Sequence, residues 1–326
     1  GAVSESDEGV AKGQRLNIRR YPVGERPSKV SVEMLGRPMT GASFRTWLER
    51  LPRILTARDL RTLVETLEES RRRHRTILWG FGGHVVKVGL GPLLVDLMER
   101  GWVTGLATNG SGVIHDFELA LWGKTSEDVD ASLPEGKFGM AEETGRLLNE
   151  AFRVGVADGL GLGAAAGRFL LAQNPPYRDG SILFNAAKRK IPVTVHVAIG
   201  TDVIHCHPEA SGAVLGEGSM RDFQTLVRMV AALHQGGTYL NWGSAVILPE
   251  VFLKAVAMVR SSGRPLERFT TADFDFLRQY RAQENVVRRP TQGSGTGLSF
   301  IGPHEIWLPL LAALLTARES AEAPES

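Results

Sequence analysis

Glycine-rich turns that follow apolar runs are the residues whose type and spacing point most directly to chemistry. Four of them stand at Gly80–His84, Thr108–Gly112, Gly200–Asp202 and Asn241–Ser244. Glycine lets backbone amides approach a phosphate, and in an open parallel sheet the ligand lies outside the carboxyl ends of the strands. Four such turns at one edge of a sheet favour a nucleotide pocket over ordinary tight turns.

Two histidine–acid pairs could supply acid–base chemistry, since imidazole titrates near neutral pH. His115 precedes Asp116, and His304 precedes Glu305, each at an expected helix start. The alternative for both pairs is that polar side chains at a helix start satisfy backbone amides. The sequence leaves both interpretations open.

A third histidine pair, His205 and His207, lies two residues apart and would share one face of a strand. The two imidazoles could contact a substrate, make ordinary hydrogen bonds, or bind zinc with Asp202 or Glu209 as further ligands. The first two interpretations are favoured, because two histidines alone do not complete a zinc site.

Two other segments invite a functional interpretation. Gly159–Gly167 imitates a dinucleotide fingerprint, but no strand precedes it and no acidic residue follows about 20 positions later. We expect small residues in close helix packing there. The basic cluster Arg71–Arg75 closes an expected helix, where cations complement the carbonyl end of the dipole. That interpretation is preferred to an anion or RNA site.

Strand–helix alternation from residue 76 onward supplies the elements that must position these residues. Apolar periodicity predicts strands over 76–81, 104–108, 192–199 and 238–242. It predicts helices over 87–100, 113–121, 141–172, 180–189, 220–233, 251–260 and 304–316, with a loop at 123–140 and a mixed segment at 269–280. The pattern predicts an α/β fold with a single doubly wound, mostly parallel sheet and helices on both faces.

The expected organisation has four parts. Residues 1–40 are an extended arm, 41–75 a helical N-terminal element, 76–318 the α/β domain with the nucleotide pocket, and 319–326 a disordered tail. Helical spacing of Leu60, Leu63, Val64 and Leu67 supports the second part.

Composition narrows the class of protein. The chain has 326 residues, 38 basic and 36 acidic side chains and a net charge of +2, which gives no support to nucleic-acid binding. A single cysteine, Cys206, excludes an intrachain disulfide. No apolar run reaches the roughly 18 residues that span a bilayer. We expect a cytoplasmic protein with no metal and no membrane partner.

Three segments, taken in order, resemble deoxyhypusine synthase. His84–Asp116 has a glycine turn, a helix, and a strand that ends in a loop rich in Thr and Gly. Ile191–Asp202 is similar to the family's strand ending in an aspartate, and Gly236–Val246 to its strand before a glycine turn. The similarity covers about residues 76–315.

The resemblance implies a Rossmann-type fold, a homotetramer built as a dimer of dimers, and NAD bound at the subunit interface. Asp116 and Asp202 would hold ribose hydroxyls or substrate amines, and Gly243 and Ser244 would meet phosphates. The complete set that it places near the cofactor is His84, Thr108, Asn109, Gly110, Asp116, Asp202, Gly243 and Ser244.

The chain departs from the family at the lysine that captures the aminobutyl group as an imine. The corresponding C-terminal stretch is Glu305–Leu311, and no lysine follows Lys254. Lys87, beside the first glycine turn, could substitute for it or pack its stem on the sheet. Transfer through a lysine imine is therefore not expected.

We accordingly expect an NAD-dependent enzyme that oxidises a small polyamine-like amine or an alcohol by hydride transfer. His115 or His205 would take the heteroatom proton. Substrate contacts would come from Asp116, Asp202, His207, Glu250, His304 and Glu305. The alternatives are aminobutyl transfer by direct attack of the acceptor amine, a catalytically silent nucleotide-binding protein, and a metal-assisted hydrolase that uses His205 and His207.

Overall fold

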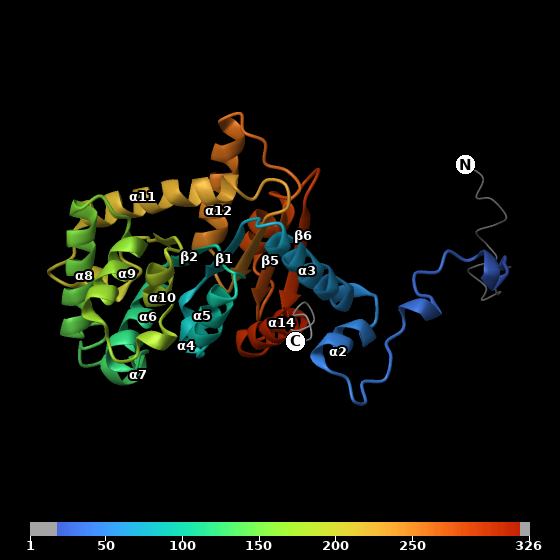
Figure 1. Cartoon of the computed structure of the whole chain (residues 1–326), viewed down its shortest axis with the longest axis horizontal. Coiled ribbons are helices and arrows are strands. Elements are labelled where there is room, and N and C mark those ends of the chain that lie inside the picture. The colour runs from blue at the N-terminus through green and yellow to red at the C-terminus, as the bar shows by residue number, and fades with distance from the viewer. Residues whose placement is uncertain (1–17, 320–326) are drawn as a thin grey trace, which may run out of the picture.

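Six parallel strands form one sheet at the centre of the molecule, in the order β3-β2-β1-β4-β5-β6 (Figure 1). The structure, a computed structural model, describes residues 18–319. The expected beginning of the arm and nearly all of the expected tail lie outside these residues. The strands are β1 (Ile77–Phe81), β2 (Gly105–Asn109), β3 (Val193–His196), β4 (Thr238–Trp242), β5 (Thr270–Asp275) and β6 (Thr296–Ile301).

The strand order places a topological switch point between β1 and β4. The chain builds outward from β1 to β3 and then crosses back to β4, which pairs with the other side of β1. Trp79 of β1 therefore stands opposite Leu106 on one side and Leu240 on the other. Ligands of such sheets bind outside the carboxyl ends at this point. The predicted doubly wound parallel sheet is confirmed.

Helices cover both faces of the sheet, and successive residues of β1 supply the two cores. Trp79 and Phe81 face one core, whereas Leu78 faces the other. This explains why the whole strand is apolar and buried. The first face carries α3 (Leu55–Arg72), α4 (Gly83–Lys87), α5 (Gly91–Glu99), α6 (Gly110–Trp122) and α14 (His304–Glu319). The second carries α11 (Gly212–Ala231), α12 (Ile247–Ser261), the three-residue α13 (Tyr280–Ala282) and the π-helix η5 (Gln283–Arg288).

Stacked aromatic rings tie the strands together on the first face. Trp242 of β4 lies between Trp79 and Phe274, at centroid distances of 5.8 and 3.8 Å, and Phe274 stacks on Phe300 at 4.6 Å. Each such pair contributes about 0.5–1.5 kcal/mol beyond the area that it buries. The row fixes the carboxyl end of β4, where one of the glycine turns begins.

A further group of helices lies on the side of β2 away from β1 (Figure 1). It contains α7 (Val129–Ser132), α8 (Glu142–Ala157), α9 (Leu162–Gln173), α10 (Ile182–Arg189), and the 3-10 turns η3 (Arg178–Gly180) and η4 (Val203–Cys206). The first turn of α9 covers the free edge of β3: a Cβ on Gly163 would lie 2.0 Å from the Val193 carbonyl oxygen. The buried carboxylate of Asp222 on α11 accepts the Val195 amide at 2.8 Å and the Gly163 amide at 3.0 Å. Close packing of the glycine run is confirmed.

Several predicted boundaries were wrong for identifiable reasons. The helix expected over 87–100 is α5, which begins only at Gly91, because Gly89, whose φ is +85°, separates it from α4, a short helix that was not predicted. The helix expected over 141–172 is α8 and α9, which meet at a bend of 112° after Gly159 with φ +87°. Helix α11 begins after the cap Ser211 instead of Ser219, and α7 and β6 were not predicted.

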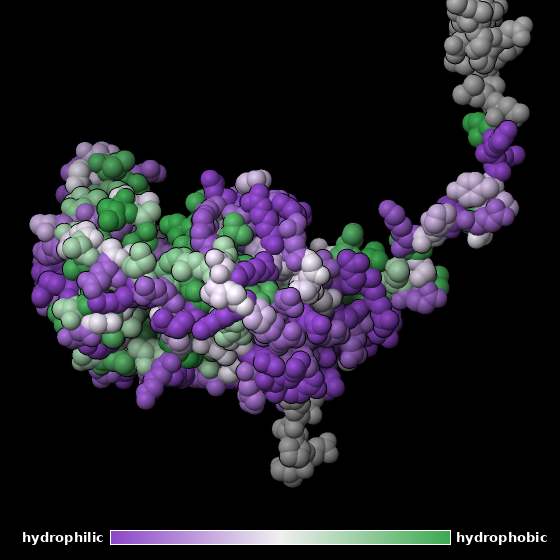
Figure 2. All heavy atoms as spheres, turned by 90° about the horizontal axis from the view of Figure 1, so that it is seen from above, coloured by the Kyte–Doolittle hydropathy of each residue, from purple (hydrophilic) through white to green (hydrophobic). Residues whose placement is uncertain are grey.

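The N-terminal part of the described chain projects from the body (Figures 1 and 2). Residues 18–43 contain two 3-10 turns, η1 (Val23–Glu25) and η2 (Val32–Met34), and no buried residue. Helix α2 (Phe44–Arg50) follows and buries Leu48 in the core, next to α14.

Within the described residues, no single helix is long and apolar enough to cross a membrane. The pair α8 and α9 passes the test together, by length and composition only.

Candidate functional site

The four glycine turns meet at the carboxyl edge of the sheet, as predicted, because glycines let neighbouring loops touch. A Cβ on Gly82 would lie 3.4 Å from the Gly243 carbonyl oxygen, across the switch point. A Cβ on Gly83 would lie 2.1 Å from Ser111 Oγ. The ends of β4, β1 and β2 are therefore in direct contact.

The contact continues to β3 through Gly110 and Asp202. A Cβ on Gly110, the first residue of α6, would lie 1.9 Å from Asp202 Oδ2. Only a residue without a side chain lets the aspartate lie against the start of the helix. Asn109 caps the same helix, since its Oδ1 accepts the Gly112 amide at 2.9 Å.

A cavity of about 720 Å³ opens beside this line of contacts, and we call it the carboxyl-edge cavity. It lies between α4, α6, the segment 122–144 and the beginning of η4. Its ionisable residues are two lysines, four carboxylic acids and one histidine: Lys87, Lys124, Glu118, Glu127, Glu143, Asp202 and His115. The acidic side chains outnumber the lysines two to one, which favours a cationic ligand.

Hydrogen bonds fix the tautomer of His115. Thr125 Oγ1 donates to Glu118 Oε1 at 2.8 Å, so its proton is already committed. The contact of 2.7 Å between Thr125 Oγ1 and His115 Nδ1 then requires the imidazole to donate from Nδ1. Thr144 Oγ1 donates to Glu118 Oε2 at 2.8 Å and so holds the second oxygen of the carboxylate to which Thr125 donates. The lone pair of His115 Nε2 is left for a ligand.

The electrostatic surroundings keep His115 neutral. Burial, followed by the nearby Lys87 ammonium, lowers the pKa of His115 to about 4. Lys87 itself is exposed at the end of α4 and lines the cavity. At neutral pH the imidazole is therefore unprotonated and can accept a proton or a hydrogen bond.

His205 has a different role, because both of its ring nitrogens are directed at protein atoms. The Gly200 amide donates to His205 Nδ1 at 3.0 Å, so the ring proton resides on Nε2. Nε2 faces Asp202 Oδ2 at 3.6 Å, and both side chains are nearly inaccessible to solvent. Burial raises the pKa of Asp202, and His205 opposes that shift. Neutral His205 has no free lone pair for a substrate proton.

His304 lies at the switch point. Its ring is 2% exposed and packs 6.0 Å from the Trp242 ring and 5.9 Å from the His84 ring, measured between centroids. A Cβ on Gly243, whose φ is +74°, would lie 2.6 Å from His304 Nε2. Burial lowers the pKa of His304, with Asp275 opposing the shift. His84 is exposed at the start of α4.

A buried polar cluster beside the switch point was not predicted from the sequence. Asn241 Nδ2 donates to Asp273 Oδ1 at 2.8 Å, and Gln283 Nε2 donates to Ser299 Oγ at 2.9 Å and lies 3.4 Å from Asp273 Oδ2. Burial and the nearby Asp275 carboxylate raise the pKa of Asp273 to about 7. The available signal was the pair Asp273 and Asp275, two apart on one face of β5.

Unsatisfied polar atoms concentrate at this edge. Within the described residues, five buried side-chain atoms there have no hydrogen-bond partner: Asp202 Oδ2, His205 Nε2, Asn241 Oδ1, Trp242 Nε1 and His304 Nδ1. Buried polar atoms are satisfied in the large majority of native structures. Ordered water or a polar ligand at this edge would satisfy these atoms.

Two residues expected near a cofactor have structural roles instead. Both oxygens of Asp116 are occupied at the start of α10: they accept from Ser181 Oγ at 2.7 Å, the Ile182 amide at 2.7 Å and the Leu183 amide at 2.9 Å. Thr108 is fully buried and donates to the Phe81 carbonyl oxygen at 2.8 Å. Ser244 Oγ accepts the Leu248 amide at 3.1 Å, but its backbone borders Gly82.

Three expected substrate contacts do not line the carboxyl-edge cavity. Glu250 is on α12, paired with Lys254 and Arg281. Glu305 is exposed on the first turn of α14. The contact of 2.8 Å between His207 Nε2 and the Gly139 carbonyl oxygen makes that imidazole a structural donor. In residues 18–319, no group of three or more His, Cys, Asp and Glu side chains could hold a metal ion.

Comparison with known proteins identifies the fold. No family model matches the sequence, and no curated protein matches it. A conserved putative LOR/SDH protein from Methanococcus maripaludis S2 is similar in structure, with a TM-score of 0.54 and 13% identity over 82% of this chain and 69% of that one. AgrE in complex with ornithine and NAD⁺ gives a TM-score of 0.54 and 17% identity over 83% of this chain. These two likenesses show a shared fold.

The chain spans 35% of the length of AgrE, so it corresponds to one part of that protein. A putative deoxyhypusine synthase from Entamoeba histolytica is also similar, with a TM-score of 0.49 and 11% identity over 86% of this chain and 96% of that one.

Proposed function

We propose that this protein is an NAD-dependent enzyme that oxidises a small amine, or an alcohol, at the carboxyl edge of its sheet. The observation that carries the proposal is His115, a neutral imidazole with a free lone pair, in an acidic cavity beside the glycine turns. The AgrE structure of the same fold is a complex with ornithine and NAD⁺, which supports both the cofactor and an amine substrate.

The residues at the switch point fit a dinucleotide. Gly82 and Gly243 carry no side chains at the ends of β1 and β4, so a dinucleotide would meet backbone there. The amides of these two glycines already donate to the Trp242 and Phe274 carbonyl oxygens, each at 2.9 Å. The unsatisfied Trp242 Nε1 and His304 Nδ1 lie on the same side and can make polar contacts with the cofactor. When bound, the nicotinamide accepts a hydride from the substrate carbon.

The chain's own groups would bind the substrate and accept its proton. Glu127, Glu143 and Asp202 provide negative charge for an ammonium group. His115 Nε2 would take the heteroatom proton, with Nδ1 held by Thr125 and Glu118. This geometry favours His115 over His205 as the base. Lys87 lies within the cavity but is exposed, and the proposal does not require a lysine imine.

A homotetramer remains part of the proposal, since the resemblance to deoxyhypusine synthase implies it. Size-exclusion chromatography with light scattering measures it directly. A monomeric protein would remove the subunit interface as the location of the cofactor while leaving the switch point intact.

The first experiment is thermal melting of the purified protein with NAD, NADH and NADP, together with a search for nucleotide retained through purification. A ligand that binds only the folded state at a hundredfold excess over its Kd stabilises by about 2.7 kcal/mol. A clear shift with NAD or NADH is expected. No shift and no retained nucleotide would contradict the proposed cofactor.

A His115→Gln variant then separates an enzyme from a silent nucleotide-binding protein. We expect the NAD-induced shift to persist and turnover of an amine substrate to fall by about 10²–10⁴. His234→Gln is the matched control, since His234 only accepts the Glu267 amide at 3.1 Å, outside the cavity. The turnover of the wild-type protein should fall only as the pH decreases toward about 4, where His115 becomes protonated. Unchanged turnover in His115→Gln would reject this base.

A further inference from the structure

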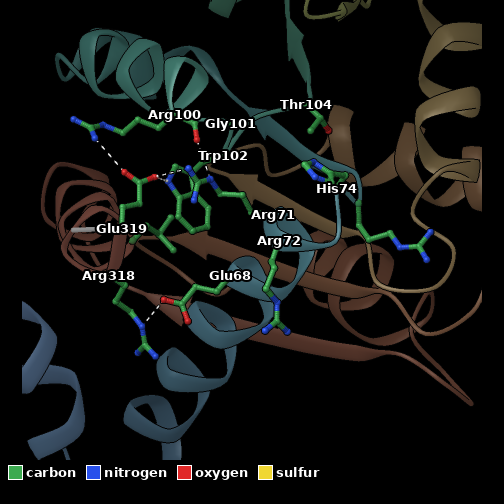
Figure 3. Close-up of a pocket in the computed structure, with 12 residues that line it drawn as sticks. Glu68, Arg71, Arg72, His74, Arg100, Gly101, Trp102, Thr104, Arg318 and Glu319 are labelled. Carbon is green, nitrogen blue, oxygen red and sulfur yellow. Dashed lines mark hydrogen bonds and ion pairs between the residues drawn. The ribbon is translucent and has the colours of Figure 1, made fainter. Parts of the chain in front are cut away.

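A second cavity, of about 470 Å³, opens at the opposite, amino edge of the sheet (Figure 3). We call it the amino-edge cavity. It lies between the end of α3, the connection from α5 to β2 and the last turns of α14. It is lined by Glu68, Arg71, Arg72, His74, Arg75, Arg100, Gly101, Trp102, Thr104, Leu315, Arg318 and Glu319. The basic cluster noted in the sequence supplies one wall.

The lining is strongly cationic. Five arginines line it against two glutamates, so it carries three more positive than negative charges, whereas the whole chain carries a net charge of only +2. Two carboxylates outside the lining, Glu69 and Asp96, form ion pairs with Arg72 and Arg100 and offset part of their positive charge. Both of these pairs are exposed, so solvent screens them and they contribute little.

One carboxylate organises two of the guanidinium groups. Glu319 Oε1 lies 3.1 Å from Arg71 Nη2, and Glu319 Oε2 lies 3.1 Å from Arg100 Nη1 (Figure 3). Trp102 Nε1 also donates a hydrogen bond to Glu319 Oε1 at 2.6 Å. Arg71 also donates to the Arg100 carbonyl oxygen at 2.9 Å and lies 4.7 Å from the Trp102 ring centroid. The two cations are therefore held in fixed positions. Arg100 has Asp96 as a second partner, whereas within residues 18–319 the only carboxylate that pairs with Arg71 is the shared Glu319.

Arg75 is the least satisfied cation of the cavity. Its Nε is buried and has no hydrogen-bond partner within residues 18–319, and it makes no ion pair there. A guanidinium group has five donors in a planar fork, and buried donors are normally paired. Arg75 thus provides a donor that a bound anion would satisfy.

We propose that the amino-edge cavity binds a small anion that carries two or more phosphate groups. Guanidinium forks match phosphate oxygens in a bidentate geometry, and the surplus of positive charge suits a multivalent anion. The volume lies within the usual range for small-molecule sites. The Trp102 ring is 2% exposed and already carries Arg71, so it offers no face on which a nucleic-acid base could stack. A compact phosphorylated molecule therefore fits better than RNA.

Pyrophosphate is the probe for this proposal, measured by calorimetry on the whole protein at fixed ionic strength. Arg75→Gln should weaken binding at least tenfold, and Arg318→Gln, on the opposite wall, should weaken it as well. Arg168→Gln is the matched control, since Arg168 is an exposed arginine of α9 paired with Asp158. Binding by Arg168→Gln should equal that of the wild type. Equal affinities for pyrophosphate and sulfate, or full binding by both cavity variants, would overturn the proposal.

Saturation with NAD separates this site from the proposed cofactor site. Pyrophosphate should bind equally well with and without NAD, because the two cavities lie at opposite ends of the strands. Displacement by NAD would assign the anion to the carboxyl edge and reject the amino-edge site. Binding of a single-stranded RNA that exceeds pyrophosphate binding and is lost in Arg75→Gln would also reject a small-molecule site.

Discussion

The contact between Gly110 and Asp202 gives the sharpest test of the geometry at the carboxyl edge. Replacing Gly110 by alanine would put the new Cβ 1.9 Å from Asp202 Oδ2 and 2.4 Å from its Cγ. Real Cβ contacts are not this short, so the aspartate must move. Because the side chain of Asp202 is almost completely buried, it has little room to do so.

The expected cost follows from two opposing terms. Inserting a methyl group into a well-packed site costs about 1–3 kcal/mol, whereas alanine is favoured over glycine in a helix by about 1 kcal/mol. Gly110→Ala should therefore lower the free energy of unfolding by up to about 2 kcal/mol. The three atoms nearest to the new methyl group all lie beyond the Cβ of Asp202. In an Asp202→Ala background, Gly110→Ala should then be neutral or stabilising.

The assay is a double-mutant cycle measured by chemical denaturation. The expected coupling energy is about 1–3 kcal/mol, as found for residues in contact. Gly216→Ala is the matched control, since Gly216 lies in α11 with no atom near its Cβ position. It should stabilise both backgrounds equally. If Gly110→Ala destabilises the Asp202→Ala protein as much as it destabilises wild type, the close approach of the two residues does not exist.

Three further predictions concern the scaffold. Leu94→Ala should lower the free energy of unfolding by about 2–5 kcal/mol, because its side chain is 1% exposed; a near-zero loss in chemical denaturation would refute its place in the core. Asp116→Ala leaves two backbone amides of α10 unpaired at roughly 1–3 kcal/mol each, and an unchanged melting temperature would contradict this role. Burial raises the pKa of Asp222 to about 7, above its unfolded value near 4. Its contribution to stability is therefore complete below about pH 4 and is lost as the pH rises toward 7. Asp222→Asn should gain stability relative to wild type between pH 5 and 8, whereas a constant difference would disprove the shift.

Strands bounded by glycine were the most predictable part of the fold. Thr238–Trp242 was predicted with its observed bounds, because a short apolar run is flanked by Gly237 and Gly243. Thr296–Ile301 was missed because it is partly exposed and Gly297 interrupts its pattern. The bend at Gly159 was missed because apolar periodicity continues on both sides of it.

The site was predictable where local sequence decides geometry, and unpredictable where distant segments meet. The glycine turns were found because parallel strands bring their carboxyl ends to one edge. The partners of Asp116 are at least 65 residues away in the chain, so its structural role has no local signal. The choice of His115 over His205 depends on which hydroxyl and amide face each ring, and spacing carries no such information.

The way in which the sheet ends at β3 has a consequence for association between molecules. An uncovered edge strand presents amides and carbonyls to which a strand of another chain can add. Here the Asp222 carboxylate accepts a hydrogen bond from the Val195 amide, and the first turn of α9 packs against the Val193 carbonyl oxygen. Protection against intermolecular strand pairing is thus encoded on two helices distant in sequence. Mutations in α11 or the start of α9 could promote aggregation while the strand itself remains unchanged.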